Sequence, residues 1–362
     1  MSNAWTRVVP ALLAVATVGV GAGPIEITVD CDRGGDLAAV LADLVDRTDG
    51  PVVVNVAGTC AGPIEIATDD VTLRGESSGT SAIEGVGARF ATPPPAVVTA
   101  HGVRNLRLEK LRISDGPVGV AAIAAEVTIE SSELSRTDVG VAAQLSSVAL
   151  AGVTLRDGRI GVEARRSRVG IGFSTIDRIS DEAIAATEFS EIVMLHSTAV
   201  SDGLSVRNSG LVATRCELEG SIHARSHSRV SLGGSAGSTA ALRGGISASN
   251  SEVFLFQLPV DGAVSVSDGG FLTAIGAGIG SVLLASAADA RISSGHVAGA
   301  ILVDGFSTAQ LVSTAVAGEV VCRRGADALC EQSQLASVSG CRNCEGTGTT
   351  PGTFGPTAAP GR

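Results

Sequence analysis

The chain has 362 residues, a formal net charge of −11 and a hydrophobic content of 44%. Only 2% of its residues are aromatic, so Val, Ile, Leu and Ala must fill the interior, which predicts a narrow core. An acidic chain without a basic run lacks the electrostatic surface that nucleic acid or anionic membranes require. We therefore expect no nucleic-acid partner.

The N-terminus is typical of a signal peptide covering residues 1–22. Arg7 supplies the positive charge, an apolar run follows from Val8 to Val20, and the small residues Gly21 and Ala22 suit cleavage after Ala22. The run is short for a transmembrane helix, although an uncleaved anchor is an alternative. We expect a secreted, periplasmic or cell-surface protein with no membrane span after signal removal.

The first predicted elements after residue 23 are a helix and three strands. Apolar residues at helical spacing between Asp36 and Asp46 predict an amphipathic helix. Strands are predicted at 51–58, 63–67 and 71–75, where β-branched residues dominate. The Pro-rich segment from Glu76 to Pro95 is predicted to be a loop.

Internal repeats dominate the rest of the chain. The segments starting at 118, 139 and 160 begin VGVAA, VGVAA and IGVEA, which is a period of 21 residues. Each repeat contains three apolar alternations of period two, which predicts three short strands. The expected inward positions form three ladders: Val118, Val139, Ile160, Ile184, Leu204, Ile222, Ile246, Val264, Leu283, Ile301 and Val320; Val127, Val148, Val169, Ile192, Val212, Val230, Val253 and Leu272; and Ile113, Leu134, Leu155, Ile179, Val200, Leu218, Leu242, Val260, Ile279, Val297 and Val316.

Three strands per repeat, joined by short turns, predict a coil with three faces. Stacked coils of this kind form an all-β, single-stranded parallel β-helix, here with at least eleven coils. One domain is expected over 23–344, with the amphipathic helix covering the open N-terminal end of the stack. The Gly-, Thr- and Pro-rich tail at 345–362 is predicted to be disordered.

The chain has seven cysteines, a number that fits an oxidising compartment. Zinc is the alternative for the four C-terminal cysteines, but only Cys341 and Cys344 have CxxC spacing. We expect disulfides whose connectivity the sequence does not assign, and we expect no metal and no cofactor. Cys216 lies far from the other cysteines in the sequence. The six disulfide candidates are Cys31, Cys60, Cys322, Cys330, Cys341 and Cys344.

The repeat resembles that of the pectin-lyase-like superfamily of right-handed parallel β-helix proteins. The resemblance rests on VGVAAQLSSVALAGVTLRDG at 139–158 and on GGDLAAVLADL at 34–44, followed by VVVNVAGTC at 52–60. It covers about Ile25 to Cys330 and implies the fold, but many functions share this scaffold. The catalytic signatures of the superfamily's polygalacturonase-like and pectate-lyase-like members are absent as sets.

The register also predicts which side chains face outward on the first-ladder strands. Most are Gly, Ala or Ser, with one charged cluster that spans neighbouring coils: Glu163, Arg207, His223 and Arg225. An acid, two arginines and a histidine could bind an anionic sugar or transfer a proton. The alternative is a solvated face whose mixed charges offset each other.

A second outward feature is apolar. Phe254 and Phe256 flank the inward Leu255, so they could form a patch for a partner, although a loop or the tail could also cover them. The turn aspartates Asp115, Asp157, Asp202 and Asp261 lie on separate coils, which favours turn formation over calcium binding.

The leading functional hypothesis is a non-catalytic scaffold or a module that binds carbohydrate or a cell-surface partner. One alternative is a polysaccharide lyase or glycoside hydrolase that acts on an anionic polysaccharide through the Glu163–Arg225 cluster. A surface or adhesion protein is a third possibility.

Overall fold

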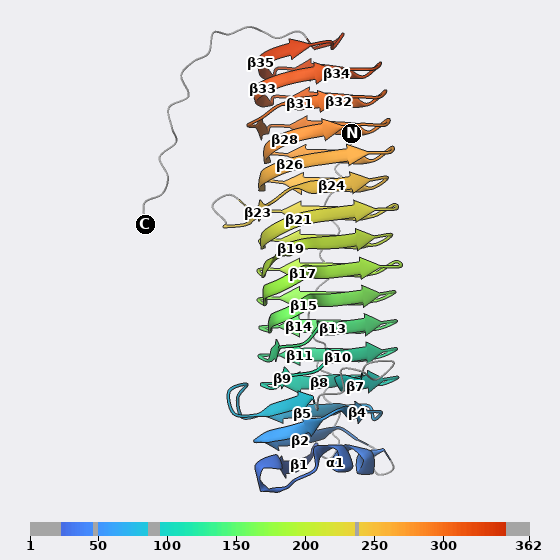
Figure 1. Cartoon of the computed structure of the whole chain (residues 1–362), viewed down its shortest axis with the longest axis vertical. Coiled ribbons are helices and arrows are strands. Elements are labelled where there is room, and N and C mark those ends of the chain that lie inside the picture. Colours follow the sequence, from blue (N-terminus) through green and yellow to red (C-terminus); the bar gives the residue numbers. More distant parts are fainter. Residues whose placement is uncertain (1–22, 46–49, 86–94, 236–238, 345–362) are drawn as a thin grey trace, which may run out of the picture.

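The computed structural model describes residues 23–45, 50–85, 95–235 and 239–344. They form a right-handed parallel β-helix whose coils stack along one long axis, with α1 at one end and β35 at the other (Figure 1). The predicted signal peptide at 1–22 and the predicted disordered tail at 345–362 lie outside the described residues. Among the described residues, no helix is long and apolar enough to cross a membrane.

One sheet of 15 strands forms a whole face of the solenoid, and its strands pair in chain order, parallel throughout. Its strands are β1 (Ile25–Asp30), β2 (Val52–Ala57), β5 (Val71–Gly75), β8 (Leu106–Glu109), β11 (Glu126–Glu130), β14 (Ser147–Ala151), β16 (Arg168–Gly172), β18 (Glu191–Leu195), β20 (Gly210–Thr214), β22 (Arg229–Gly233), β25 (Glu252–Phe256), β27 (Phe271–Ile275), β29 (Asp289–Ser293), β32 (Thr308–Val312) and β34 (Asp327–Glu331).

A second sheet of 20 strands covers the other two faces, because its pairing continues around the corner between them. Its strands are β3 (Thr59–Gly62), β4 (Ile64–Ile66), β6 (Ala82–Gly85), β7 (Ala96–His101), β9 (Arg112–Ser114), β10 (Val118–Ile123), β12 (Glu133–Ser135), β13 (Val139–Gln144), β15 (Thr154–Arg165), β17 (Thr175–Thr187), β19 (Thr198–Arg207), β21 (Glu217–Arg225), β23 (Ala241–Arg243), β24 (Ile246–Ser249), β26 (Pro259–Ser267), β28 (Gly278–Leu284), β30 (His296–Val297), β31 (Ile301–Val303), β33 (Ala315–Cys322) and β35 (Gln334–Ser339).

We call the face that contains β10 and β13 the first face, the 15-stranded sheet the second face, and the face that contains β9 and β12 the third face. The first corner joins the first and second faces and includes Leu145, and the second corner joins the second and third faces and includes Phe173. The third corner joins the third face to the first face of the next coil and includes Asp157. All three residues have a positive φ, the left-handed conformation that turns the chain sharply. One continuous core of buried aliphatic side chains fills the interior.

The structure corrects the first ladder in its first three coils. The column that continues to Ile184 and Leu204 begins with Val120, Val141 and Val162. The predicted Val118, Val139 and Ile160 lie two residues earlier, in the column that continues to Glu182. Val139 and Ile160 pack outside the main core, in a small cluster with Ala185. The cause is a break in the alternation at the third corner, where Gly140 and Val141 are both buried in succession.

Four other ladder positions also shift. Val282, not Leu283, is the register partner of Val264, and Leu283 is exposed. Leu211 occupies the second-face position predicted for Val212. On the third face, Ile176 and Ala199 replace the predicted Ile179 and Val200, because the long strand β17 carries extra residues between Ile176 and Ile184 relative to its neighbours.

The N-terminal end is closed by helix α1 (Leu37–Leu44), which begins after the cap residue Asp36. Leu37, Leu41 and Leu44 join the main core, but Val45, predicted to share that apolar face, is 56% exposed. The predicted strands at 51–58, 63–67 and 71–75 are β2, β4 and β5. The predicted loop at 76–95 contains β6, which pairs with β3 and β9 because Ala82 and Ile83 continue the buried column.

Three disulfides lie at the two ends of the solenoid. Cys31 in the short 3-10 helix η1 (Cys31–Arg33) is joined to Cys60 at the N-terminal end. At the C-terminal end, Cys322 is joined to Cys341 and Cys330 to Cys344. All six predicted disulfide cysteines are therefore paired, and Cys216 is free and buried.

A column of buried serines lies on the inner side of the first corner. Each hydroxyl accepts a hydrogen bond from the N–H of the corresponding residue one coil earlier, as Ser190 does from Ser167 at 3.2 Å. Each also donates to a nearby carbonyl of its own turn, as Ser190 does to Thr187 at 2.6 Å. This serine ladder satisfies backbone groups that the sharp turn would otherwise leave unpaired inside the protein. Its members are Ser146, Ser167, Ser190, Ser209, Ser228 and Ser251.

Candidate functional site

The outward side of the first face contains the predicted charged cluster. Arg207 and Arg225 are register partners on β19 and β21, and His223 is the partner of Ser205 one column away. Glu163 lies on β15 opposite Ala185, so one coil separates it from the coil of Arg207. All four side chains are exposed, as predicted.

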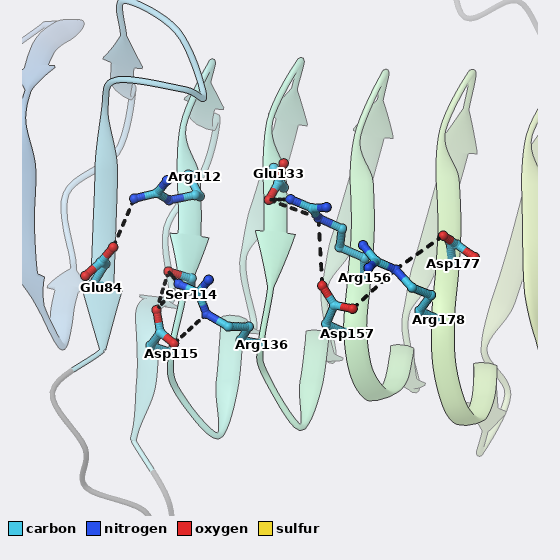
Figure 2. Close-up of polar contacts among 10 residues, drawn as sticks. All are labelled: Glu84, Arg112, Ser114, Asp115, Glu133, Arg136, Arg156, Asp157, Asp177 and Arg178. Carbon is cyan, nitrogen blue, oxygen red and sulfur yellow. Dashed lines mark hydrogen bonds and ion pairs between the residues drawn. The ribbon is translucent and has the colours of Figure 1, made fainter.

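Arg207 and Arg225 form no ion pair with any residue that the structure describes. Their coils lie about 4.8 Å apart, and like charges directly opposite each other on a sheet are destabilising. The third face shows the opposite arrangement (Figure 2). There, Arg112 reaches Glu84 at 3.0 Å and Arg156 reaches Glu133 at 2.6 Å. The first face therefore presents two adjacent guanidinium groups whose charge is not neutralised.

Two hollows adjoin these arginines. The first, which we call the Glu182 hollow, has a volume of about 300 Å³ and is lined by Glu182, Ser205, Arg207, His223 and Arg225. The second, the Glu163 hollow, measures about 570 Å³ and includes Glu163, Arg165, Glu188 and Arg207. Arg207 lines both hollows, so the structure brings three of the four predicted residues together and places the fourth, Glu163, in the adjoining hollow.

The carboxylate of Glu182 was not predicted as a site residue. Burial raises the pKa of Glu182, although a hydrogen bond from Ser205 and the nearby charge of His223 act in the opposite direction. Ile160 is its register partner on the previous coil, so an apolar surface borders it on one side. A carboxyl group that gains a proton more readily than usual is a candidate acid or base.

The Glu163 hollow contains a second group of charges that are already paired. Arg165 and Arg166 both contact Glu188, the latter at 3.0 Å. The hydrogen bond from Arg165 lowers the pKa of Glu188, so this carboxylate remains charged. The unneutralised positive charge therefore belongs to Arg207 and Arg225.

Phe254 and Phe256 both lie on the outer side of β25, as predicted. The Arg229 guanidinium covers the ring of Phe254 at 5.4 Å from its centroid, and Phe256 is 50% exposed beside Ile275 on the next coil. Only part of the predicted patch is therefore available to a partner.

The turn aspartates lie apart from one another. Asp115 and Asp157 adopt positive φ at the third corner. Arg136 donates to Asp115 at 2.7 Å, and this hydrogen bond lowers the pKa of Asp115 (Figure 2). Asp202 and Asp261 lie within β19 and β26. Within the described ranges, no group of three or more His, Cys, Asp or Glu side chains is arranged to hold a metal ion.

Comparison with known proteins finds similarity at the level of structure. No family model and no curated protein matches the sequence. The catalytic domain of a GH87 α-1,3-glucanase, solved with tetrasaccharides, aligns at a TM-score of 0.50 and 11% identity, over 90% of this chain and 70% of that one. A pectin methylesterase from carrot aligns at a TM-score of 0.30 and 12% identity, over 74% of this chain and 85% of that one. The likeness to the glucanase domain concerns the fold alone: the chain is a right-handed parallel β-helix protein.

Proposed function

We propose that this protein is an exported, non-catalytic module that binds an acidic polysaccharide on its first face. The observation that supports this most directly is the pair of unneutralised arginines on neighbouring coils, Arg207 and Arg225, which both line the Glu182 hollow, while Arg207 also lines the Glu163 hollow. A guanidinium group matches the planar geometry of a carboxylate and can bind it through two hydrogen bonds. A bound sugar carboxylate would also remove the repulsion between the two arginines.

The proposed export rests on cysteine chemistry and on the N-terminal sequence. Three disulfides are typical of proteins that fold in an oxidising compartment. The predicted signal peptide at 1–22 would direct the chain there. Saccharides are the first ligand class to test, because the glucanase domain with the same fold was solved with tetrasaccharides.

The test is calorimetric titration with oligogalacturonides, which carry one carboxylate per sugar. We expect Arg207→Ala combined with Arg225→Ala to weaken binding by about 10- to 100-fold, since a hydrogen bond to a charged group is worth about 1.5–3 kcal/mol. Arg178→Ala is the matched control, because Arg178 is also exposed but is paired with Asp157 at 3.3 Å. Binding of the wild-type protein should weaken as salt is added. Equal affinities for wild type and double variant would refute the proposal.

A second candidate function is a lyase or hydrolase that acts on the same acidic polysaccharide. The specific observation is Glu182, whose pKa is raised by burial and whose carboxyl shares a hollow with His223. Such a group could donate a proton to a leaving oxygen. If the wild-type protein cleaves oligogalacturonides and Glu182→Gln abolishes cleavage while binding persists, the non-catalytic proposal is wrong.

A further inference from the structure

A third depression follows the first corner, beyond the acidic-saccharide site. This corner groove has a volume of about 760 Å³ and spans the turns from Phe189 to Gly269. Four corner residues line it in succession, one from each coil: Phe189, Asn208, His227 and Asn250. Phe271 borders the groove on the second face and is 38% exposed.

The groove is corrugated because the turns differ in length. Two residues with positive φ form the turns at Glu188–Phe189 and at Ser226–His227, whereas Asn208 alone forms the turn between them. The longer turns therefore project on either side of a short one. Phe189 is 79% exposed, while Asn208 is half-buried. Two coil spacings, about 10 Å, separate the two projecting rings.

The floor of the groove beside Asn208 is open. The next strand begins at Gly210, where a Cβ atom would meet nothing within 4 Å. The Asn208 side chain makes no hydrogen bond to any described residue, so both its amide donor and its carbonyl acceptor are available. At the following turns, Asn250 lies 3.2 Å from the Nε2 atom of His227. The groove therefore combines exposed rings with neutral groups that can both donate and accept.

The charges along the groove are already neutralised, in contrast to those on the first face. Glu191 is paired with Arg168 at 2.7 Å, and Arg229 is paired with Glu252 at 2.7 Å. An acidic ligand would find no free cation there. A ligand with apolar ring faces and many neutral hydroxyl groups matches this lining, because aromatic rings cover apolar faces and amides pair with hydroxyls.

We infer that the corner groove is a second binding site and that it takes a neutral saccharide chain. Phe189 stacks on the face of one sugar ring, which lies over Gly210 between Phe189 and His227. The Asn208 amide binds the hydroxyl groups of that sugar. The groove adjoins the acidic-saccharide site, because Asn208 and His227 also line the Glu163 hollow. The inference goes beyond that site and does not depend on it, because Phe189 and Gly210 line the corner groove and not the Glu163 hollow.

The experiment is titration of the full chain with a length series of neutral gluco-oligosaccharides, α-1,3- and β-1,4-linked, followed by calorimetry and amide chemical shifts. We expect Phe189→Ala to weaken binding about tenfold. Gly210→Leu should block it, because the Cβ has open space there and the longer side chain would occupy the floor of the groove. Phe306→Ala is the matched control, since Phe306 is 78% exposed and also has positive φ at the first corner.

The two proposed sites can be separated in the same experiment. The Arg207→Ala and Arg225→Ala double variant should lose oligogalacturonide binding and keep the neutral oligosaccharide. The inference is overturned if no member of the neutral series binds at millimolar concentration, or if Phe189→Ala and Gly210→Leu both bind as wild type does. Equal losses in Phe189→Ala and Phe306→Ala would also overturn it, because binding would then not be confined to the groove.

Discussion

Removal of one hydroxyl from the serine ladder should destabilise the solenoid measurably, and Ser190→Ala is the clearest perturbation. The Ser190 side chain accepts from the Ser167 N–H at 3.2 Å and donates to the Thr187 carbonyl at 2.6 Å. Both serines are buried, with exposures of 2% and 5%. Alanine at position 190 would therefore leave a buried N–H without an acceptor.

The expected magnitude follows from that lost acceptor. A buried donor left unpaired costs about 1–3 kcal/mol, so we expect the free energy of unfolding to fall by about 2 kcal/mol. The same loss of about 2 kcal/mol predicts that the Ser167 backbone amide exchanges its hydrogen about 30-fold faster in Ser190→Ala than in the wild type, if exchange proceeds through local opening of this turn. Exchange is the better assay, because a long stack of coils can unfold in parts.

The control is Ser249→Ala, because the Ser249 hydroxyl bonds to the exposed Asp268 carboxylate at 2.7 Å and should contribute little. Unchanged exchange at Ser167 in Ser190→Ala, together with a loss of stability no larger than that of Ser249→Ala, would refute the argument. The Ser167 N–H would then have found an acceptor other than the Ser190 hydroxyl.

Three further predictions concern single residues. Cys216→Ser should keep wild-type thermal stability while Cys216→Val loses it, because Cys216 lies at the second corner, where Ser174 and Ser197 occupy the same position on the two preceding coils, and its thiol bonds to the Thr214 carbonyl at 3.4 Å. Burial raises the pKa of this thiol, so it should resist alkylation in the folded protein. Glu163→Gln should tighten oligogalacturonide binding several-fold in calorimetry, because it removes a negative charge from a hollow that Arg207 also lines. Glu182→Gln should raise the melting temperature at about pH 7 and leave it unchanged below about pH 4. Because the pKa of Glu182 is raised in the folded protein, its charged carboxylate opposes folding only as the pH rises. A higher melting temperature that persists at low pH would contradict this cause.

The fold could be predicted because one physical pattern repeats along most of the chain. Each strand is short and buried on one side, so apolar residues alternate with period two, and stacked coils align them. The errors arose where alternation breaks. At the third corner Gly140 and Val141 are buried in succession, so a rule of strict alternation placed Val139 inside.

The candidate site was harder to predict than the fold. The outward positions of Arg207, His223 and Arg225 followed from the register, but Glu182 was missed because the predicted ladder set Ile184 opposite Ile160. With the correct register, Glu182 continues the outward apolar column that ends at Ile160. A carboxylate in an otherwise apolar outward column indicates a candidate site residue. Glu182 can be recognised as such a residue only once the bulges in β17 are known, and these come from the structure.

The lengths of the coils indicate where the solenoid departs from pure repetition. Successive ladder serines are 21 residues apart from Ser146 to Ser167, then 23 to Ser190, 19 to Ser209 and 19 to Ser228. A scaffold that only needed to stack could keep one length, because each coil contacts just its neighbours. The Glu182 hollow, the Glu163 hollow and the corner groove all lie along the coils that vary. Extra residues there produce the bulges in β17 and the projecting turn at Phe189, so irregular coil length is the sequence feature most useful for locating binding surfaces on this fold.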